Sequence, residues 1–326
     1  MNKKENWNLK TLVLEKIKDN GGWVNAHSHL DRAYTITDQD LALSNQRLQQ
    51  KWELVDELKK RSTVAQIYDR MAFALEKQLA QGVTALGTFI DVDEVIKDKA
   101  IQAAARLKEN YQTAIDLVFI NQTLKGVLDA KARKWLEEAL NFVDIIGGLP
   151  ARDAGREDEH LDVLFSLAKQ HKKMVHVHVD QLNTVREKET ELLIKKTREH
   201  KLQGQAVAVH SVSLAAQPIE YRQKIYQQLQ QQQLMVIVCP TAWIDSRRSE
   251  ELMVSHNAIA PVEELVAAQI PVALGTDNIA DIYKPFSDGE MWTELRFLLE
   301  ACHFYDIDAL VKIATVNGRK VLGLSI

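Results

Sequence analysis

Cysteine is scarce in this chain, and long apolar runs are missing. Cys239 and Cys302 are the only thiols among 326 residues, which excludes a disulfide framework and favours a reducing, cytoplasmic location. No stretch approaches the roughly 18 apolar residues that a transmembrane helix needs. The first residues include lysines but no apolar segment behind them, so we predict no signal peptide.

An excess of charge of either sign is also missing. The 41 Lys and Arg residues nearly balance the 45 Asp and Glu residues, for a net charge of −4. A basic face for nucleic acid or for an anionic membrane is therefore not expected. Apolar residues make up 46% of the chain and charged residues 26%, as is typical of a globular enzyme. We expect its partner to be a small-molecule substrate.

The sequence does contain a regular alternation of short apolar runs and segments with helical spacing. The apolar runs show little polar alternation, which indicates strands of a parallel sheet buried on both faces. Eight such units favour an α/β fold of the (β/α)8 TIM-barrel type, although spacing alone leaves an open sheet as the alternative. We expect a single domain over 1–326, with the barrel strands between about 22 and 277 and C-terminal helices over 290–322. The predicted strands are 22–27, 83–91, 114–120, 143–149, 173–179, 206–211, 234–239 and 271–276, and the predicted helices are 63–81, 94–110, 130–141, 159–171, 185–202, 214–233, 261–269, 290–302 and 306–322.

Histidine and aspartate recur where these strands end. In (β/α)8 barrels the carboxyl ends of the strands meet at one face, and active sites lie there. Imidazole and carboxylate are ligands for Zn²⁺ or Fe²⁺, and a site that leaves a position for water is catalytic rather than structural. We therefore predict a metal site built from residues that close the first, fifth, sixth and eighth strands: His27, His29, His178, His210 and Asp277.

Other histidines have a more ordinary interpretation. His176 lies two residues before His178 on the same strand, so it points the same way but deeper into the barrel. The histidines on helices or loops are expected to be core or surface residues: His160, His171, His200, His256 and His303.

Three loops at the same face are candidates for substrate contacts. Segment 31–62 is long for a first connection and includes a predicted charged helix over 46–60, so it is either a lid or a solvated cap. After the seventh strand, Trp243 is a candidate substrate contact, while Arg247 and Arg248 would either clamp an anionic substrate group or be surface charges. The loop 281–289 would close one side of the pocket.

The strand-end motifs resemble those of the amidohydrolase superfamily, and within it the cytosine deaminase branch. The resemblance runs in order from about residue 22 to residue 323. The first and last segments are typical of the superfamily, and those of strands four and five are typical of the branch. The matching segments are Asn25-Ala-His-Ser-His-Leu-Asp-Arg, Thr88-Phe-Ile-Asp-Val, Val143-Asp-Ile-Ile-Gly-Gly-Leu-Pro, His178-Val-Asp-Gln and Leu274-Gly-Thr-Asp-Asn, with a common superfamily ending from Ala314.

This resemblance implies one divalent metal ion. Two-metal members need a bridging ligand at the end of strand four, and here that end, 147–150, reads Gly-Gly-Leu-Pro. Zn²⁺ or Fe²⁺ is expected, with Mn²⁺ as a further option. The implied ligands are His27, His29, His178 and Asp277.

The resemblance also implies catalytic and substrate-binding residues. Asp277 would accept a proton from the attacking water as well as contact the metal. His210 would hydrogen-bond that water or the substrate oxygen. Gln122 would bind the substrate ring from the end of strand three.

Two positions depart from the family pattern. Gln181 stands where deaminases of the superfamily have a glutamate that passes a proton to the ring. An amide cannot act as a general acid at neutral pH, although it can still hydrogen-bond the substrate. Asp180 is the nearest replacement acid. Asn278 replaces a second aspartate, and as both donor and acceptor it remains a candidate substrate-binding residue.

The sequence thus predicts a metal-dependent hydrolase of a carbon–nitrogen bond in a small compound. Deamination or ring-amide hydrolysis of an N-heterocycle is the leading interpretation. An acyclic amide or carbamate hydrolase, and a non-catalytic homologue that binds a metal or ligand, are the alternatives. The family's small β-domain, normally built from both chain ends, is not expected. Homo-oligomers are common among barrel enzymes, but we find no apolar seam that predicts one.

Overall fold

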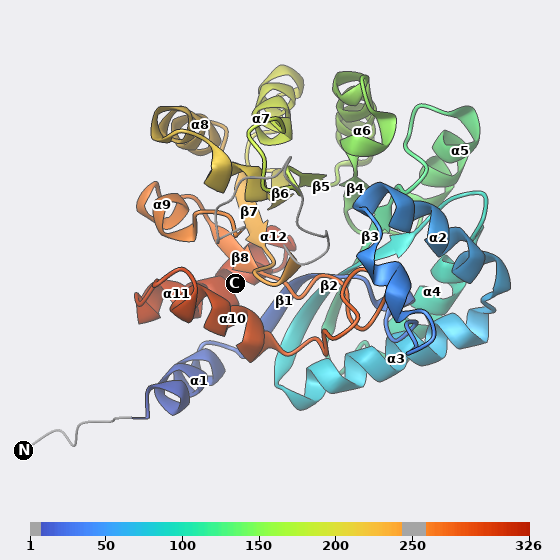
Figure 1. Cartoon of the computed structure of the whole chain (residues 1–326), viewed down its shortest axis with the longest axis horizontal. Helices are drawn as coiled ribbons and strands as arrows, with labels where there is room; N and C mark the ends of the chain where they lie inside the picture. The colour runs from blue at the N-terminus through green and yellow to red at the C-terminus, as the bar shows by residue number, and fades with distance from the viewer. Residues whose placement is uncertain (1–7, 243–258) are drawn as a thin grey trace, which may run out of the picture.

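Eight parallel strands form the centre of the computed structural model, which describes residues 8–242 and 259–326 (Figure 1). Hydrogen-bonded neighbours follow chain order from β1 to β3 and from β4 to β8. Single bridges join the two groups, because Ile120 pairs with Ile145 and Ser28 pairs with Asp277. The fold is the predicted (β/α)8 barrel. Its strands are β1 (Trp23–Ser28), β2 (Val83–Asp91), β3 (Asp116–Gln122), β4 (Ile146–Gly148), β5 (Val175–Val179), β6 (Ala206–His210), β7 (Met235–Val238) and β8 (Val272–Leu274).

Helices surround this ring of strands (Figure 1). Several begin at a residue whose side chain caps the helix. At α3, for example, the Thr63 hydroxyl accepts from the Gln66 N–H at 3.2 Å while the Gln66 side chain accepts from the Thr63 N–H at 3.0 Å, a reciprocal cap that satisfies two helix-end donors. The helices are α1 (Leu9–Asp19), α2 (Leu48–Arg61), α3 (Val64–Ala80), α4 (Lys99–Tyr111), α5 (Ala130–Ala139), α6 (Glu157–His171), α7 (Glu189–His200), α8 (Ile219–Gln231), α9 (Val262–Ala267), α10 (Met291–Glu300), α11 (Ile307–Ala314) and α12 (Val316–Val321).

Some predicted helix boundaries are wrong. The segment 306–322 forms two helices instead of one, because Thr315 between them has a non-helical backbone (φ −131°, ψ −97°). Helix α4 begins at Lys99, later than predicted, and residues 212–216 form a separate 3-10 turn (η4, Val212–Ala216) before Pro218 and α8. Helix α1, before the first strand, was not predicted.

Two apolar layers hold the barrel together. One lies between the strands and the surrounding helices, and the other fills the barrel interior. Interior side chains such as Val207, Val209 and Ile237 are fully buried, and Val321 of α12 joins them at the amino-terminal end of the barrel. His176 lies in this interior, where its Nε2 is 2.8 Å from the Val321 carbonyl oxygen. The prediction that His176 lies deep in the barrel is therefore confirmed.

No helix within the described ranges is long and apolar enough to cross a membrane.

Candidate metal centre and active site

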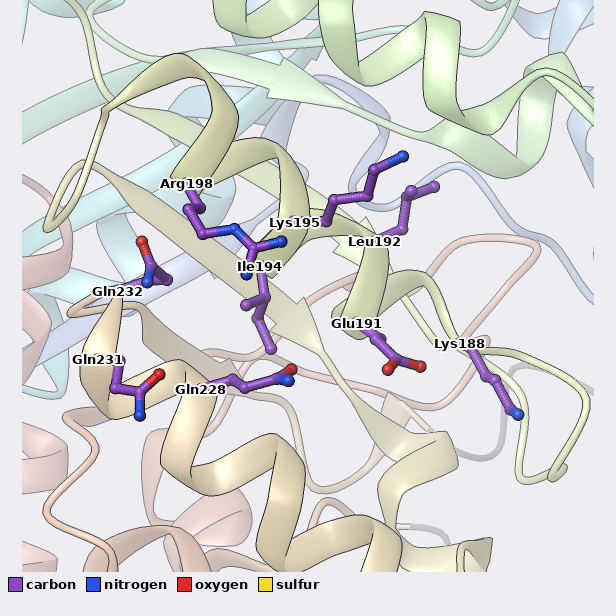
Figure 2. Close-up of a pocket in the computed structure, with 9 residues that line it drawn as sticks. All are labelled: Lys188, Glu191, Leu192, Ile194, Lys195, Arg198, Gln228, Gln231 and Gln232. Carbon is purple, nitrogen blue, oxygen red and sulfur yellow. The ribbon is translucent and has the colours of Figure 1, made fainter.

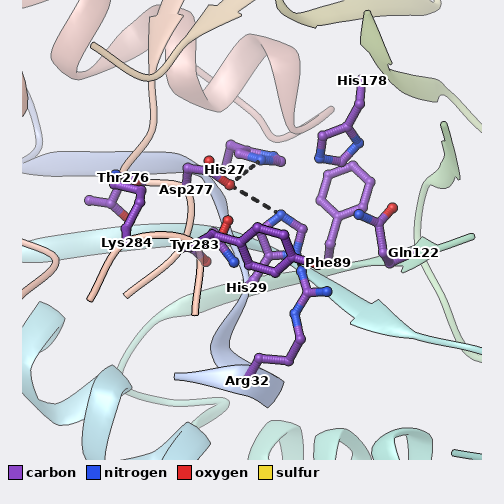
Figure 3. A network of polar contacts seen from close by, with 12 residues as sticks. His27, His29, Arg32, Phe89, Gln122, His178, Thr276, Asp277, Tyr283 and Lys284 are labelled. Carbon is purple, nitrogen blue, oxygen red and sulfur yellow. Dashed lines mark hydrogen bonds and ion pairs between the residues drawn. The ribbon is translucent and has the colours of Figure 1, made fainter. Parts of the chain in front are cut away.

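The strand-end histidines and Asp277 meet at the carboxyl end of the barrel (Figure 3). The Asp277 Oδ1 atom lies 3.2 Å from His27 Nε2 and 3.2 Å from His29 Nε2. A second set joins His27 to the rings of His178 and His210, and the candidate ligand atoms within each set lie within 4.8 Å of one another. Every one of these residues is buried. The structure thus brings together all five residues that the strand ends predicted.

A close approach of two strands places Asp277 on the histidines. A Cβ atom at Gly275 would lie 2.7 Å from the His27 Cβ and 2.9 Å from the His27 carbonyl oxygen, so β8 can pass this close to β1 only with glycine there. The Asp277 N–H then donates to the His27 carbonyl at 3.0 Å. Asp277 itself has φ +57°, a conformation that non-glycine residues seldom adopt and that recurs at functional sites.

A buried polar network supports this segment from behind. The Asn25 side chain donates to the Thr276 hydroxyl at 2.9 Å and accepts from the Thr276 N–H at 3.2 Å. Lys284, fully buried, donates to the Thr276 carbonyl at 2.6 Å. The sequence did not predict the role of Asn25, Thr276 or Lys284, because their spacing does not indicate a contact between the first and the last strand of the barrel.

His210 reaches the cluster through an unusual backbone. Val207 and Val209 face the barrel interior, so strict alternation would turn His210 away from it. The φ of +80° at His210 breaks that alternation, and its ring centroid lies 5.3 Å from that of His178. The predicted position is confirmed, but the backbone that produces it could not be predicted from the strand pattern.

The His178 imidazole has the hydrogen bonding that a metal ligand needs. His178 Nδ1 lies 3.3 Å from the Gly148 carbonyl oxygen, an acceptor that fixes the ring proton on Nδ1 and leaves a lone pair on Nε2. His178 Nε2 and His27 Nδ1 are buried and have no hydrogen-bond partner among the residues that the structure describes. Buried polar atoms without partners are uncommon, and here they are ring nitrogens within the histidine cluster. The residues present fit a divalent metal ion.

The protonation states also suit a metal. Burial, with help from the Arg32 charge, lowers the pKa of His29 to about 3, and burial lowers the pKa of His210 to about 4. Burial holds the pKa of His178 well below its usual value. Burial alone would raise the pKa of Asp277, but hydrogen bonds from His27 and His29 keep it well below its ordinary range. At neutral pH the site therefore offers neutral imidazoles at His29, His178 and His210 and an ionised carboxylate at Asp277, the forms that bind metals.

A narrow pocket with a cavity volume of about 20 Å³ opens on this cluster. Gln122, Gln181 and Asn278, predicted as substrate-binding or catalytic residues, all line it. The Gln122 Oε1 atom accepts from the Thr123 N–H at 3.2 Å, and the Asn278 Nδ2 atom donates to Asp281. Trp243, the remaining predicted contact, lies outside the described residues, as do Arg247, Arg248 and His256.

Asp180 cannot replace the missing glutamate. Its two carboxylate oxygens accept from the backbone N–H groups of Glu189 (2.7 Å) and Thr190 (3.1 Å) at the start of α7. Asp180 also has φ +52°, which ends the strand alternation there. The carboxylate therefore caps a helix and is not part of the pocket lining.

Helix α2 is more than a solvated cap. Leu48 and Trp52 of this helix line the pocket, and Leu48, Trp52 and Val55 pack on Leu124, Leu149 and Tyr283 around the mouth of the site. Two ion pairs flank this contact, one between Lys125 and Asp56 at 2.6 Å and one between Arg152 and Glu53 at 3.2 Å. Tyr283 belongs to the loop 281–289, so the prediction that this loop closes one side of the pocket is confirmed.

A second hollow lies on the outer surface between α7 and α8 (Figure 2). Its walls are long polar and charged side chains such as Lys195, Arg198 and Gln228. No strand-end residue contributes to it, so it is separate from the metal cluster.

Known proteins are similar to this chain over most of its length. The model of the amidohydrolase family matches residues 22–326. A protein of Haemophilus influenzae is 47% identical over 79% of this chain and 95% of its own length. The N-isopropylammelide isopropyl amidohydrolase of Pseudomonas sp. strain ADP is 26% identical over 93% of this chain and 74% of its own length.

A solved structure has the same fold. The 5-methylcytosine deaminase of Klebsiella pneumoniae, liganded with 5-fluorocytosine, superposes with a TM-score of 0.85 at 23% identity, covering 92% of this chain and 74% of that protein. The family match spans far more than half of the sequence and includes every strand-end ligand. The chain belongs to the amidohydrolase family, the metal-dependent hydrolases that act on carbon–nitrogen bonds.

Proposed function

We propose that this protein hydrolyses a carbon–nitrogen bond of an N-heterocycle, by deamination or by ring-amide hydrolysis. The observation that carries the proposal is the Asp277 carboxylate, which lies 3.2 Å from both His27 Nε2 and His29 Nε2 and lines the same pocket as Gln122 and Asn278. The named relatives, which act on a triazine and a pyrimidine amine, support the same class.

The proposed metal site is mononuclear. His27, His29, His178 and Asp277 would hold one divalent ion, Zn²⁺ or Fe²⁺ in preference to Mn²⁺. A Cβ atom at Gly147 would lie 1.9 Å from the Asn121 carbonyl oxygen, so this position has no room for a side chain, and Leu149, which lines the pocket, has no ligand atom. When bound, such an ion lowers the pKa of water from 15.7 toward about 7 and makes hydroxide available at neutral pH.

The protein's own side chains would then orient the reaction. Asp277, ionised at neutral pH, would accept the proton of the attacking water. His210, buried on the same face, would hydrogen-bond the oxygen that forms on the attacked carbon. Gln122 would hold the ring, and Trp52 with Tyr283 would exclude bulk water.

The absence of an acid at position 181 favours two alternatives, namely hydrolysis of an acyclic amide or carbamate and binding without catalysis. With Gln181 in the pocket wall and Asp180 capping α7, this position supplies no acid to protonate a ring nitrogen. Hydrolysis of an amide or carbamate does not need that proton transfer, and a binding protein needs no acid at all. The predicted cytoplasmic location and any homo-oligomer remain expectations.

Mass spectrometry of products distinguishes these cases. Metal-reconstituted protein is incubated with purines, pyrimidines, triazines, hydantoins and acyclic amides, with the His178→Ala variant as control. Replacement of an amine by oxygen shifts the mass by about +1 Da, and ring opening adds a water of about +18 Da. Either product supports the proposal. Cleavage of acyclic amides alone would favour an acyclic amide or carbamate hydrolase. If no compound gives a metal-dependent product, the proposal of hydrolysis is contradicted.

A further inference from the structure

Arg32 is a buried cation in the pocket wall that the proposed reaction does not use. It is the last residue of the short 3-10 turn η1 (Leu30–Arg32), which directly follows the strand carrying His27 and His29. Only 4% of its surface is exposed, yet it lines the same pocket as Gln122 and His178.

The guanidinium lies close to the carboxylates of Asp31, Asp91 and Asp281, but in the described part of the chain it makes only one hydrogen bond. Its Nη2 atom donates to His29 Nδ1 at 2.8 Å, and its Nη1 atom forms an ion pair with Asp91 at 3.5 Å, beyond good hydrogen-bond length. Nε and Nη1 are buried without a hydrogen-bond acceptor in the described part of the chain. A guanidinium has five N–H donors, so an occupant of the pocket that brings acceptors would satisfy donors that the protein leaves unpaired.

A bound metal would release one more donor. His29 Nε2 is the ring atom that faces Asp277, and an imidazole that binds a metal through Nε2 carries its proton on Nδ1. An N–H group cannot accept from Arg32, so Nη2 would lose its present acceptor. The metal-loaded site would then present a guanidinium edge to the pocket.

The neighbouring pocket residue is also a donor. The Gln122 Oε1 atom is occupied by the Thr123 N–H, and Figure 3 shows the amide nitrogen of Gln122 turned toward His178 and Phe89. The Tyr283 ring lies 5.3 Å from the Arg32 guanidinium carbon and limits its movement. Arg32 and Gln122 therefore both favour an acceptor atom on the ligand.

We propose that Arg32 is a specificity-determining residue that binds an acceptor oxygen, an oxo or carboxylate group, on the ring substrate. The planar fork of arginine matches such oxygens and cannot accept a hydrogen bond from an amino group. A substrate with an amino or alkyl group in that place would leave the donors unpaired, and sites built around a hydrogen bond reject such analogues strongly. This inference deepens the proposed function and rests on it only in assuming that the pocket takes a ring.

A matched ligand pair tests the inference by binding. Calorimetry on the metal-reconstituted full chain compares pyrimidin-2-one, which has the oxygen, with 2-methylpyrimidine, which has a methyl group there. We expect the wild type to prefer pyrimidin-2-one at least tenfold. In Arg32→Met the affinity for pyrimidin-2-one falls 10- to 100-fold, the affinity for 2-methylpyrimidine is unchanged, and the preference disappears.

Controls separate this role from a structural one. Arg156→Met replaces an exposed arginine, whose ion pair with Glu159 is on the surface, and should keep the wild-type preference. Arg32→Lys keeps a cation beside Asp91 but loses the fork, so it should stay folded with its metal and still lose most of the preference. If Arg32→Met does not fold, Arg32→Lys decides the question. Metal content and thermal midpoints are measured for each variant.

The two proposals fail separately. The role of Arg32 would be overturned if the wild type binds neither ring compound. It would also be overturned if the Arg32 variants lower the affinity for both compounds equally or leave both affinities unchanged, even if hydrolysis is found with other compounds. A preference that disappears in Arg32→Met while the wild type hydrolyses nothing would support Arg32 as a ligand-binding residue and contradict the proposed catalysis.

Discussion

Gln181 is the single residue on which the type of reaction depends most. It lines the pocket, where the resemblance to deaminases implies a glutamate, and the adjacent Asp180 is committed to the start of α7. An amide neither gives nor takes a proton at neutral pH. General acid–base catalysis by a well-placed group contributes typically 10²–10⁴-fold.

We therefore predict that Gln181→Glu raises the rate of deamination of an aminopyrimidine or aminotriazine by at least tenfold. The rate is followed as released ammonia at neutral pH, and Gln217→Glu, a change on a buried amide after η4, serves as control. An unchanged rate in a variant that keeps its metal would show that position 181 does not control proton transfer.

Glu187, which is hydrogen-bonded to the loop that carries Gln181, makes the stability of the protein depend on pH. Its Oε2 atom accepts from the Leu182 N–H at 2.8 Å and from the Ser213 hydroxyl at 3.0 Å, and burial raises its pKa to about 7 from an ordinary value of 4.5. Because the folded state holds this proton more tightly than the unfolded state, stability is lost as the pH rises from about 4.5 through 7. One pKa unit corresponds to about 1.4 kcal/mol, so the loss is at most ~3 kcal/mol.

Glu187→Gln should remove this dependence, because the amide oxygen still accepts and never ionises. The free energy of unfolding in urea at pH 5 and pH 8 measures the effect, and Glu263→Gln on the exposed side of α9 is the control. The prediction is wrong if wild type and Glu187→Gln lose the same stability between the two pH values.

At the scale of elements, α2 covers the mouth of the site. It is held over the mouth by a small apolar cluster around Trp52 and by ion pairs at its edge. Lys59, near the other end of α2, is buried in ion pairs with Asp91 at 3.3 Å and Asp93 at 2.5 Å. Opening for substrate entry would therefore separate the Trp52 end of the helix from the mouth while Lys59 anchors the other end. From this packing we predict that α2 moves as a lid.

Trp52→Ala should weaken substrate binding without releasing the metal. Loss of the indole opens the pocket wall, and we expect KM to rise roughly tenfold, equivalent to about 1.4 kcal/mol, with metal content unchanged. Lys60→Ala, an exposed change on the same helix, should have no effect. Metal loss in Trp52→Ala would mean that α2 is part of the metal site's framework and not only its cover.

At the scale of the whole molecule, the features that could be predicted are those that repeat. Eight apolar runs gave eight strands, and the rule that barrel strand ends form the site placed His27, His178 and Asp277 together. Features that depend on a single backbone angle or a distant partner could not be predicted. The φ of His210, the helix break at Thr315 and the capping role of Asp180 are of this kind.

The pocket wall was harder still to predict. Arg32 follows a recognised motif but has no periodic signal, and its function depends on where Gln122 and Tyr283 lie in space. The alternatives for segment 31–62, lid or solvated cap, were open in the sequence because charge on one face of a helix does not reveal what the other face covers. The packing of Trp52 settles the position of α2 at the mouth.

Metal removal tests how the site and the barrel depend on each other. The barrel has apolar layers inside and outside its strands that do not involve the metal cluster, so the chelated protein should stay folded by circular dichroism. A metal at a thousand times its Kd adds about 4.1 kcal/mol of stability, which should raise the thermal midpoint by several degrees. His178→Ala should abolish this rise, whereas His200→Ala, on α7 beside Asp162, should keep it. An equal rise of the thermal midpoint in wild type and His178→Ala would place the stabilising ion elsewhere. Unfolding on chelation would make the metal part of the fold, because the apolar layers alone would then not be enough to hold the strands in a ring.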